Sequence, residues 1–174
     1  NATVAIEGFG KVGGGVARYM AKMGAKVAAI STIDGAIFNE NGLDVGRLLE
    51  MRKKFGDKVV LGYEDAKHIS KEDLLYLPVD ILVPCAGPYV INESNVDRIQ
   101  ARVIVSGANI PITQEAEEIL FRKGVISLPD FICNAGGVIC GMIGMVGGTE
   151  EQAFACVKKL IESTTKEILE TAFK

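Results

Sequence analysis

The sequence predicts an α/β domain in which helices cover both faces of a doubly wound, mostly parallel sheet, with one further helix at the C-terminal end. Short aliphatic runs alternate with stretches of helical periodicity along most of the chain, which is typical of β-α-β units. Several of these runs are continuously apolar, as expected for strands that are covered on both faces. A glycine-rich segment directly follows the first run, which favours a strand, a tight turn and a helix in that order.

Length and composition exclude several classes of protein. The chain has 174 residues, of which 48% are hydrophobic. A chain of this size buries roughly 70% of the surface of its unfolded form, so we expect one domain that needs no disulfide or structural metal. The formal net charge of −3 provides no basic field, which argues against nucleic acid as a partner. No apolar run approaches the roughly 20 residues that span a bilayer, so we expect no membrane segment.

Six strands are predicted from the β-rich runs. They centre on Thr3–Ile6, Val27–Ile30, Val59–Leu61, Ile81–Val83, Val103–Val105 and Val125–Ser127.

Helical spacing and capping residues predict the helices between these strands. The first helix should place one apolar stripe on its buried face and end at Gly24; the stripe comprises Val12, Val16, Met20 and Met23. A second helix is expected over about 43–55, and a short one begins at Ser70. Thr113 opens another, with its C-cap at Gly124 and with Ala116, Ile119 and Leu120 on one side.

The last helix begins with a capping signal. The Thr149 hydroxyl can cap the first turn while Gln152 reaches back to it. Its apolar stripe has helical spacing and must pack against another part of the protein; it comprises Val157, Leu160, Ile161, Thr164 and Ile168.

The glycine-rich segment after the first strand carries the pattern GxGxxG and predicts a phosphate-binding turn. It reads Gly8, Phe9, Gly10, Lys11, Val12 and Gly13. Gly8 permits the tight turn, Gly10 lets a pyrophosphate approach the backbone, and Gly13 lets the helix lie close to the strand. The helix N-terminus adds free N–H groups and a positive dipole. A turn that serves packing alone is the alternative interpretation.

The end of the second strand leaves the choice of dinucleotide open. Enzymes that use NAD usually place a carboxylate there to bind the adenosine ribose. This chain has Ser31 and Thr32, and Asp34 follows as the nearest carboxylate; we favour an ordinary Asp-Gly turn for Asp34. The Thr32 hydroxyl could bind a 2′-hydroxyl or a 2′-phosphate. We therefore expect NAD or NADP, with tolerance of NADP.

The cysteines do not form a metal-binding pattern. They stand at positions 85, 133, 140 and 156 without a CxxC pair, and the single histidine, His68, is distant from them in sequence. We therefore expect no metal site, buried thiols and a reducing, cytoplasmic setting. The chain starts without a methionine almost directly on the first strand, so we expect that a longer protein precedes it.

The order of motifs resembles the glutamate, leucine, phenylalanine and valine dehydrogenases, specifically their C-terminal dinucleotide-binding domain, and glutamate dehydrogenase most of all. The resemblance extends over nearly the whole chain, because these motifs occur in family order and spacing. Besides the GxGxxG segment, they are Gly35–Asn39, Gly42–Asp44, Asp80–Ala86, Gly107–Asn109, Pro129–Asp130 and Asn134–Val138.

The resemblance implies a Rossmann-like domain with one reversed strand, and it implies roles for matched residues. Cys85 and Ala86 would line the adenosine side of the cofactor site. Asn109 and Asn134 would lie beside the nicotinamide and its ribose, where a neutral amide can both donate and accept hydrogen bonds. Judged from the residues alone, each asparagine could equally be a turn or cap residue.

The resemblance also implies that residues 1–148 form the NAD(P)-binding domain and residues 149–174 form a helix that links back to an absent substrate domain. In the family, a catalytic lysine and a catalytic aspartate lie upstream of this segment. We therefore expect no catalytic residue here, an inactive isolated chain, and a homo-oligomer for the full-length protein.

Two functional hypotheses follow. The first is the cofactor domain of an amino-acid dehydrogenase that deaminates an L-amino acid to a 2-oxo acid and ammonia. The substrate stays open, because the family's polar stretch after Gly-Gly-Val is replaced here by the apolar run 139–145. The second is a stand-alone dinucleotide-binding regulatory module without catalysis.

Overall fold

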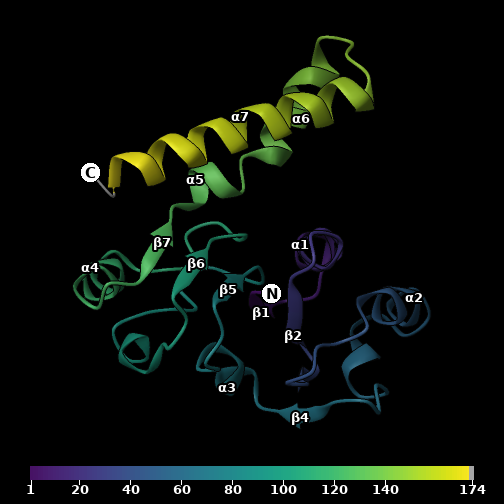
Figure 1. Ribbon diagram of the computed structural model, residues 1–174. Helices are drawn as coiled ribbons and strands as arrows, with labels where there is room; N and C mark the ends of the chain where they lie inside the picture. The colour runs from purple at the N-terminus through teal and green to yellow at the C-terminus, as the bar shows by residue number, and fades with distance from the viewer. Residues whose placement is uncertain (173–174) are drawn as a thin grey trace.

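The computed structural model describes residues 1–172, and its centre is a seven-stranded sheet of order β4-β3-β2-β1-β5-β6-β7 (Figure 1). β1 pairs in parallel with β2 and β5, and the parallel pairing continues through β6 to β7. β3 runs antiparallel to both β2 and β4, which confirms the reversed strand implied by the family resemblance. The strands are β1 Thr3–Glu7, β2 Lys26–Thr32, β3 Gly35–Phe38, β4 Lys67–Ile69, β5 Ile81–Pro84, β6 Val103–Val105 and β7 Ile126–Leu128.

Helices cover both faces of this sheet, as predicted. The side chains of Thr113 and Ser70 cap α4 and α3 as expected, and Asp44 caps α2. Gly24 and Gly124 follow α1 and α4 with positive φ angles, consistent with their predicted role in ending these helices. The helices are α1 Lys11–Lys22, α2 Val45–Phe55, α3 Lys71–Leu75, α4 Gln114–Arg122, α5 Asp130–Cys133, α6 Gly136–Met145 and α7 Glu150–Ala172, with 3-10 turns η1 Gly56–Val60 and η2 Val96–Arg98.

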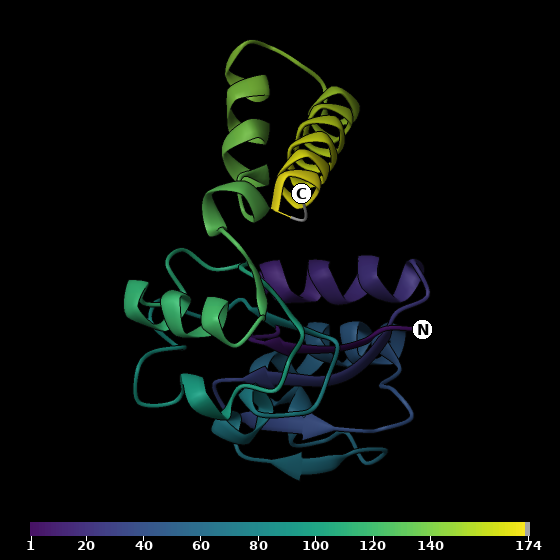
Figure 2. The same cartoon turned by 60° about the vertical axis from the view of Figure 1, so that its left-hand side comes forward.

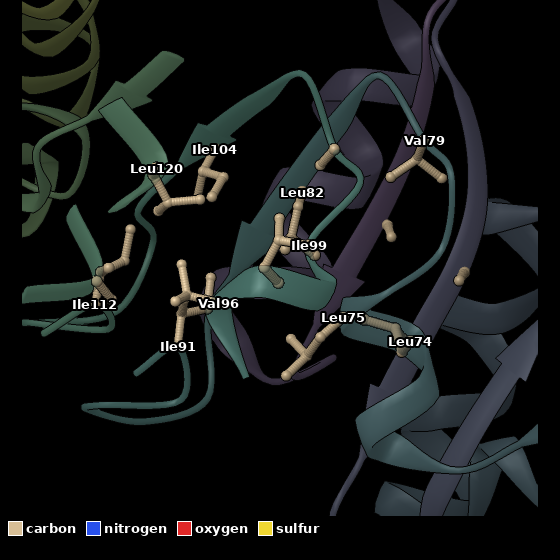
Figure 3. Close-up of a cluster of buried hydrophobic side chains, with 14 of the residues drawn as sticks. Leu74, Leu75, Val79, Leu82, Ile91, Val96, Ile99, Ile104, Ile112 and Leu120 are labelled. Atoms are coloured by element: carbon tan, nitrogen blue, oxygen red, sulfur yellow. The ribbon is translucent and has the colours of Figure 1, made fainter. Parts of the chain in front are cut away.

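The core has two parts, one on each face of the sheet. Alternate residues of β1 point to opposite faces, so Ala5 joins one cluster and Val4 and Ile6 join the other. The first cluster packs β5 and β6 against α3, η2 and α4, and includes Leu82, Ile104 and Leu120 (Figure 3). The second packs the sheet against α1, α2 and η1. The two clusters together fix β1 at the centre of the sheet.

Five of the six predicted strands are confirmed, and the one predicted at Val59–Leu61 is wrong. Val59 and Val60 are fully buried, but they belong to η1, which packs beneath β2 and β3. Two consecutive buried valines occur both in strands and in buried turns, so this sequence pattern alone does not predict which of the two forms. The sheet is extended at this edge by β3 and β4, which are short strands that sequence analysis did not predict.

The buried face of α1 differs from the predicted stripe. Val12 and Met23 are exposed, whereas Gly13, Gly14 and Ala17 are buried. Small residues face the sheet because α1 lies very close to β1, and a side chain at Gly14 would already touch Leu49 of α2. Gly13, Gly14 and Ala17 therefore form the buried part of the packing surface, and Val16 and Met20 of the predicted stripe pack partly buried beside them.

Helices α6 and α7 form a hairpin that projects away from the sheet layers (Figure 2). The capping signal at its turn is confirmed: Thr149 N–H donates to Gln152 Oε1 (2.9 Å), and Gln152 N–H donates to Thr149 Oγ1 (3.3 Å). The stripe of α7 is half-buried against α5 and α6, except for Leu160, which is exposed. Helices α5 and α6 were not predicted. Phe173 and Lys174 of the predicted 149–174 segment lie outside the described residues.

Within residues 1–172, no helix is both long and apolar enough to cross a membrane. No group of three or more His, Cys, Asp or Glu side chains in the same range is arranged to hold a metal ion. All four cysteines are free and partly buried.

Candidate functional site

The turn between β1 and α1 requires glycine at two of the predicted positions. Gly8 has a φ of +91°, and a Cβ atom there would lie 2.8 Å from the Cβ of Ala86. A Cβ at Gly13 would overlap the carbonyl oxygen of Gly8. Helix α1 therefore approaches the turn as closely as the GxGxxG pattern predicts, and Phe9 anchors the turn in the core with only 1% of its surface exposed.

The same turn leaves room for an anion at the start of α1. A Cβ at Gly10, the N-cap residue, would meet nothing within 4 Å. No side chain caps the first amides of α1, and its first turn holds no acidic residue. These N–H groups carry the positive end of the helix dipole, and Lys11 is exposed beside them. The arrangement is suited to binding a phosphate group.

Ser31, near the end of β2, holds the turn through hydrogen bonds, whereas Thr32 bonds to other segments. Gly8 N–H donates to Ser31 Oγ (2.9 Å), and Phe9 N–H donates to the Ser31 carbonyl (2.6 Å). The Thr32 hydroxyl donates to the Asp57 carbonyl (2.7 Å) and accepts from Asp34 N–H (3.2 Å). Only 6% of Thr32 is exposed, so the expected contact of its hydroxyl with a ribose is not available in this arrangement.

Asp34 lies in the tight turn that joins β2 to β3, where Thr32 pairs with Gly35. This geometry confirms the interpretation of Asp34 as an Asp-Gly turn residue. Its side chain is exposed at the carboxyl edge of the sheet.

A cleft of about 510 Å³ opens at the carboxyl ends of β1, β5 and β6. It brings together Val12, Cys85, Ala86, Asn109 and Asn134 of the predicted site, which come from four separate segments of the chain. The remaining lining residues are Gly87, Pro88, Gly107, Ala108 and Ile110. This is the edge at which open α/β sheets bind ligands, where neighbouring connections leave the sheet on opposite faces.

The two predicted asparagines meet across this cleft. Asn134 Nδ2 donates to Asn109 Oδ1 (2.6 Å) and to the Ala108 carbonyl (3.1 Å). Asn134 is also the C-cap residue of α5, which confirms the alternative cap role, while its binding role stays a prediction. The pair ties the loop after β6 to α5 at the mouth of the cleft.

Glu7, the last residue of β1, is a site residue that sequence analysis did not identify. Its Oε2 accepts the N–H of Ala86 (3.1 Å), which fixes the segment after β5. Burial raises the pKa of Glu7, although backbone N–H groups of Ala86 and Cys85 and the charge of Lys71 oppose this shift. Burial and then the charge of Glu7 raise the pKa of the Cys85 thiol to about 12, so this thiol forms a neutral wall of the cleft.

A second hollow, of about 290 Å³, extends from Gly10 between α1 and α2. Four cationic side chains line it: Lys11, Arg18, Arg52 and Lys53. Arg52 Nη2 lies 3.8 Å from Asp57 Oδ1, whereas its Nε atom is buried without a hydrogen-bond partner among the described residues. We refer to these four residues with Gly10, Gly14, Gly15 and Leu49 as the basic hollow. Sequence analysis did not identify this hollow, because α1 and α2 had not been placed side by side.

A third hollow, of about 840 Å³, lies at the opposite edge of the sheet. It is lined by the amino ends of the strands and their connections, including Asp80, Arg102 and Lys123. It contains none of the predicted site residues. The amide-rich turn and the cleft of 510 Å³ are better suited to a dinucleotide, because they combine an anion-binding helix N-terminus with polar side chains at the carboxyl edge.

Comparisons with known proteins find a matching family model, sequence relatives and solved structures of similar fold. The family model described as Glutamate/Leucine/Phenylalanine/Valine dehydrogenase matches residues 1–174. A glutamate dehydrogenase of Aeropyrum pernix is 43% identical over 173 residues, which cover 96% of this chain and 41% of that protein. An NADP-specific glutamate dehydrogenase of Saccharolobus shibatae is 40% identical over 136 residues, covering 78% of this chain and 32% of that protein. The chain thus spans about two fifths of the first relative's length.

The fold is similar to that of solved dehydrogenases. A structure of hetero-hexameric glutamate dehydrogenase from Thermus thermophilus superposes with a TM-score of 0.82 at 23% identity, and the match covers 97% of this chain and 41% of that one.

Proposed function

Because the chain belongs to the glutamate, leucine, phenylalanine and valine dehydrogenase family, we propose that it is the dinucleotide-binding part of an amino-acid dehydrogenase. The observation that carries this proposal is the cleft at the carboxyl edge of the sheet, which joins the uncapped first turn of α1 to Asn109 and Asn134. A dinucleotide requires both features, one for its pyrophosphate and one for its nicotinamide half.

The residues present fit such a cofactor. The open space at Gly10 lets a pyrophosphate approach the first amides of α1, and Lys11 adds positive charge. Asn109 and Asn134 can orient a carboxamide or a ribose hydroxyl without adding charge. When bound, the nicotinamide ring supplies the hydride acceptor. The neutral Cys85 thiol and Ala86 form the wall between these two regions.

The amino acid itself would be held by parts of the protein outside this chain. Oxidative deamination needs an acid and a base aimed at the substrate as well as a hydride acceptor. The site assembled here provides groups for the cofactor only, so we propose that the isolated chain binds the dinucleotide without turning over amino acids. We also propose that the full-length protein is a homo-oligomer.

We propose that NADP is the preferred cofactor. The pyrophosphate turn at β1 has β2 on one side, so an adenosine ribose extending toward β2 would lie next to the basic hollow. A 2′-phosphate in the basic hollow could accept hydrogen bonds from the guanidinium group of Arg52, which lines it. The carboxylate that usually binds a free 2′-hydroxyl is absent from positions 31 and 32.

Calorimetric titration of the chain with NADP+ and NAD+ tests dinucleotide binding. We expect Gly10→Val to lower the affinity for both cofactors by more than about tenfold, because the new side chain fills the space for the pyrophosphate. The unfolding temperature should hardly change, since a Cβ at Gly10 meets no atom within 4 Å. Equal affinity of the variant and the wild-type chain would refute the proposed site.

A second pair of variants tests the choice of NADP. Arg52→Gln should weaken the binding of NADP+ by about 10- to 100-fold, which is the effect of losing a charged hydrogen bond. The affinity for NAD+ should not change. Lys54→Gln is the matched control, because it removes the same charge from the same helix outside the basic hollow. NAD+ binding as tightly as NADP+ in the wild-type chain would exclude this preference.

A further inference from the structure

One carboxylate holds the loop after β6 against α5 at the mouth of the cleft. Asp130 Oδ2 accepts the N–H of Ile110 (2.7 Å), and Asp130 Oδ1 accepts the N–H of Phe131 (2.7 Å). Both oxygens of Asp130 are therefore engaged with backbone donors, one from each of the two segments. Asparagine at this position would have one acceptor oxygen and would turn its NH2 group toward an N–H donor.

The loop that Asp130 holds is conformationally strained. Ile110 has a φ of +47°, in the left-handed region that β-branched residues avoid. Tyr89, in the segment after β5, has a φ of +55°, and its N–H donates to the Ile110 carbonyl (2.9 Å). Residues in such conformations persist only where the surroundings fix them, and they are often found at binding sites. Here Asp130 fixes the N–H side of Ile110 and Tyr89 fixes its carbonyl side.

The strained residue directly follows Asn109, and α5 ends at Asn134, which donates to Asn109. Asp130 therefore lies at one end of the four-residue helix whose other end contacts the cleft. Releasing Ile110 would let its backbone relax toward ordinary φ values and would move the side chain of the preceding Asn109 relative to Asn134. Neither Asp130 nor Phe131 lines the cleft itself.

We propose that Asp130 is a positioning residue for the nicotinamide half of the dinucleotide. It acts through the Ile110 backbone, which it holds in the left-handed conformation that presents Asn109 to the cleft. The inference rests on the proposed dinucleotide-binding function. The nicotinamide half is implicated because β5, β6 and β7 lie on the side of β1 opposite to β2 and the basic hollow.

The test compares ligands that differ only by the nicotinamide. NADP+ is paired with 2′-phospho-ADP-ribose, and NAD+ with ADP-ribose, in calorimetric titrations of the chain. We expect Asp130→Asn to lower the affinity for the tighter-binding dinucleotide by about 10- to 100-fold. The affinity for the matching ligand without nicotinamide should stay within about twofold of the wild-type value. A merely structural role would weaken both members of a pair equally.

Two further variants sharpen the comparison. Asp130, Ile110 and Glu117 line a further hollow of about 480 Å³ beside the cleft. Glu117→Gln removes a carboxylate from this hollow, but no hydrogen bond of the described residues joins the Glu117 side chain to the loop. We expect it to bind like the wild-type chain. Ile110→Gly combined with Asp130→Asn should recover part of the lost affinity, because glycine adopts positive φ without strain.

The outcomes separate this inference from the proposed function. If Asp130→Asn lowers the affinity for both ligands of a pair equally, or for neither, the positioning role is refuted. Binding by the wild-type chain would still support the proposed function. If the double variant binds no better than Asp130→Asn alone, strain at Ile110 is not what Asp130 controls. A wild-type chain that binds none of the four ligands would refute the proposed function and this inference together.

Discussion

At the scale of single residues, two glycines determine how closely α1 approaches the sheet. Their roles could be predicted, because the GxGxxG spacing after a strand carries the geometry within six consecutive residues. Glu7 and Asp130 could not be found in this way. Their partners, Ala86 and Ile110, are 79 and 20 residues distant in sequence, so these contacts exist only once the strands are ordered in the sheet.

Alanine substitutions within α1 test this account of the glycines. Gly13→Ala should destabilise the chain by about 2 kcal/mol or more, because its Cβ would overlap the Gly8 carbonyl. Gly15→Ala, two residues along, should stabilise it by up to about 1 kcal/mol, since its Cβ meets nothing within 4 Å and alanine favours the helix. Urea unfolding measures both changes, and equal effects of the two substitutions would refute the close approach.

The raised pKa of Glu7 predicts how stability depends on pH. The folded chain binds the Glu7 proton more tightly than the unfolded chain, since burial is the main cause of the shift. The free energy of unfolding should therefore lose a contribution as pH rises from near 4.5, the ordinary pKa, through the raised value. Glu7→Gln stays neutral and its carbonyl can still accept the Ala86 N–H, so it should not show this loss.

Urea unfolding of the wild-type chain and Glu7→Gln across this pH range measures the effect. The stability of the variant relative to the wild-type chain should increase with pH. Parallel curves would show that burial of Glu7 does not disfavour its charged form.

At the scale of elements, capping residues predicted helix ends well, whereas short apolar runs did not separate strands from turns. Thr113 and Thr149 cap the helices expected of them, because a cap depends on neighbours three residues away. Helix α6 was missed since four of its ten residues are glycine, which lowers its intrinsic helix propensity. It forms by packing against α7, where Gly136 lies within reach of Val157 and Ile161.

The hairpin of α6 and α7 should be the least stable part of the described chain. Helix α6 has no buried residue, and Ala153 is the only one in α7 up to Ala172. Amide hydrogen exchange should therefore report a lower opening free energy for this hairpin than for β1 and β5. Thr149→Ala should lower the opening free energy of α7 by about 1 kcal/mol and leave β1 unchanged. Protection of the hairpin equal to that of the sheet would contradict this view.

At the scale of the whole molecule, the position of the site follows from the order of the strands. β1 lies between β2 and β5; the chain leaves β1 through α1 on one face of the sheet and leaves β5 toward η2 on the other. The cleft opens where these connections diverge. Sequence analysis predicted this architecture from the alternation of strands and helices, and the motif order then identified the family. It did not predict the basic hollow, which depends on the packing of α1 against α2.

The central claim is that the chain binds a dinucleotide at the carboxyl edge of its sheet, and NMR mapping tests it most directly. Amide shifts are measured while the labelled chain is titrated with NADP+. We predict the largest changes at Gly10 and its neighbours in the first turn of α1, at Ala86, and at Asn109 and Asn134. Changes confined to the hollow at the opposite edge, around Arg102 and Lys123, or no saturable change at all, would contradict the claim.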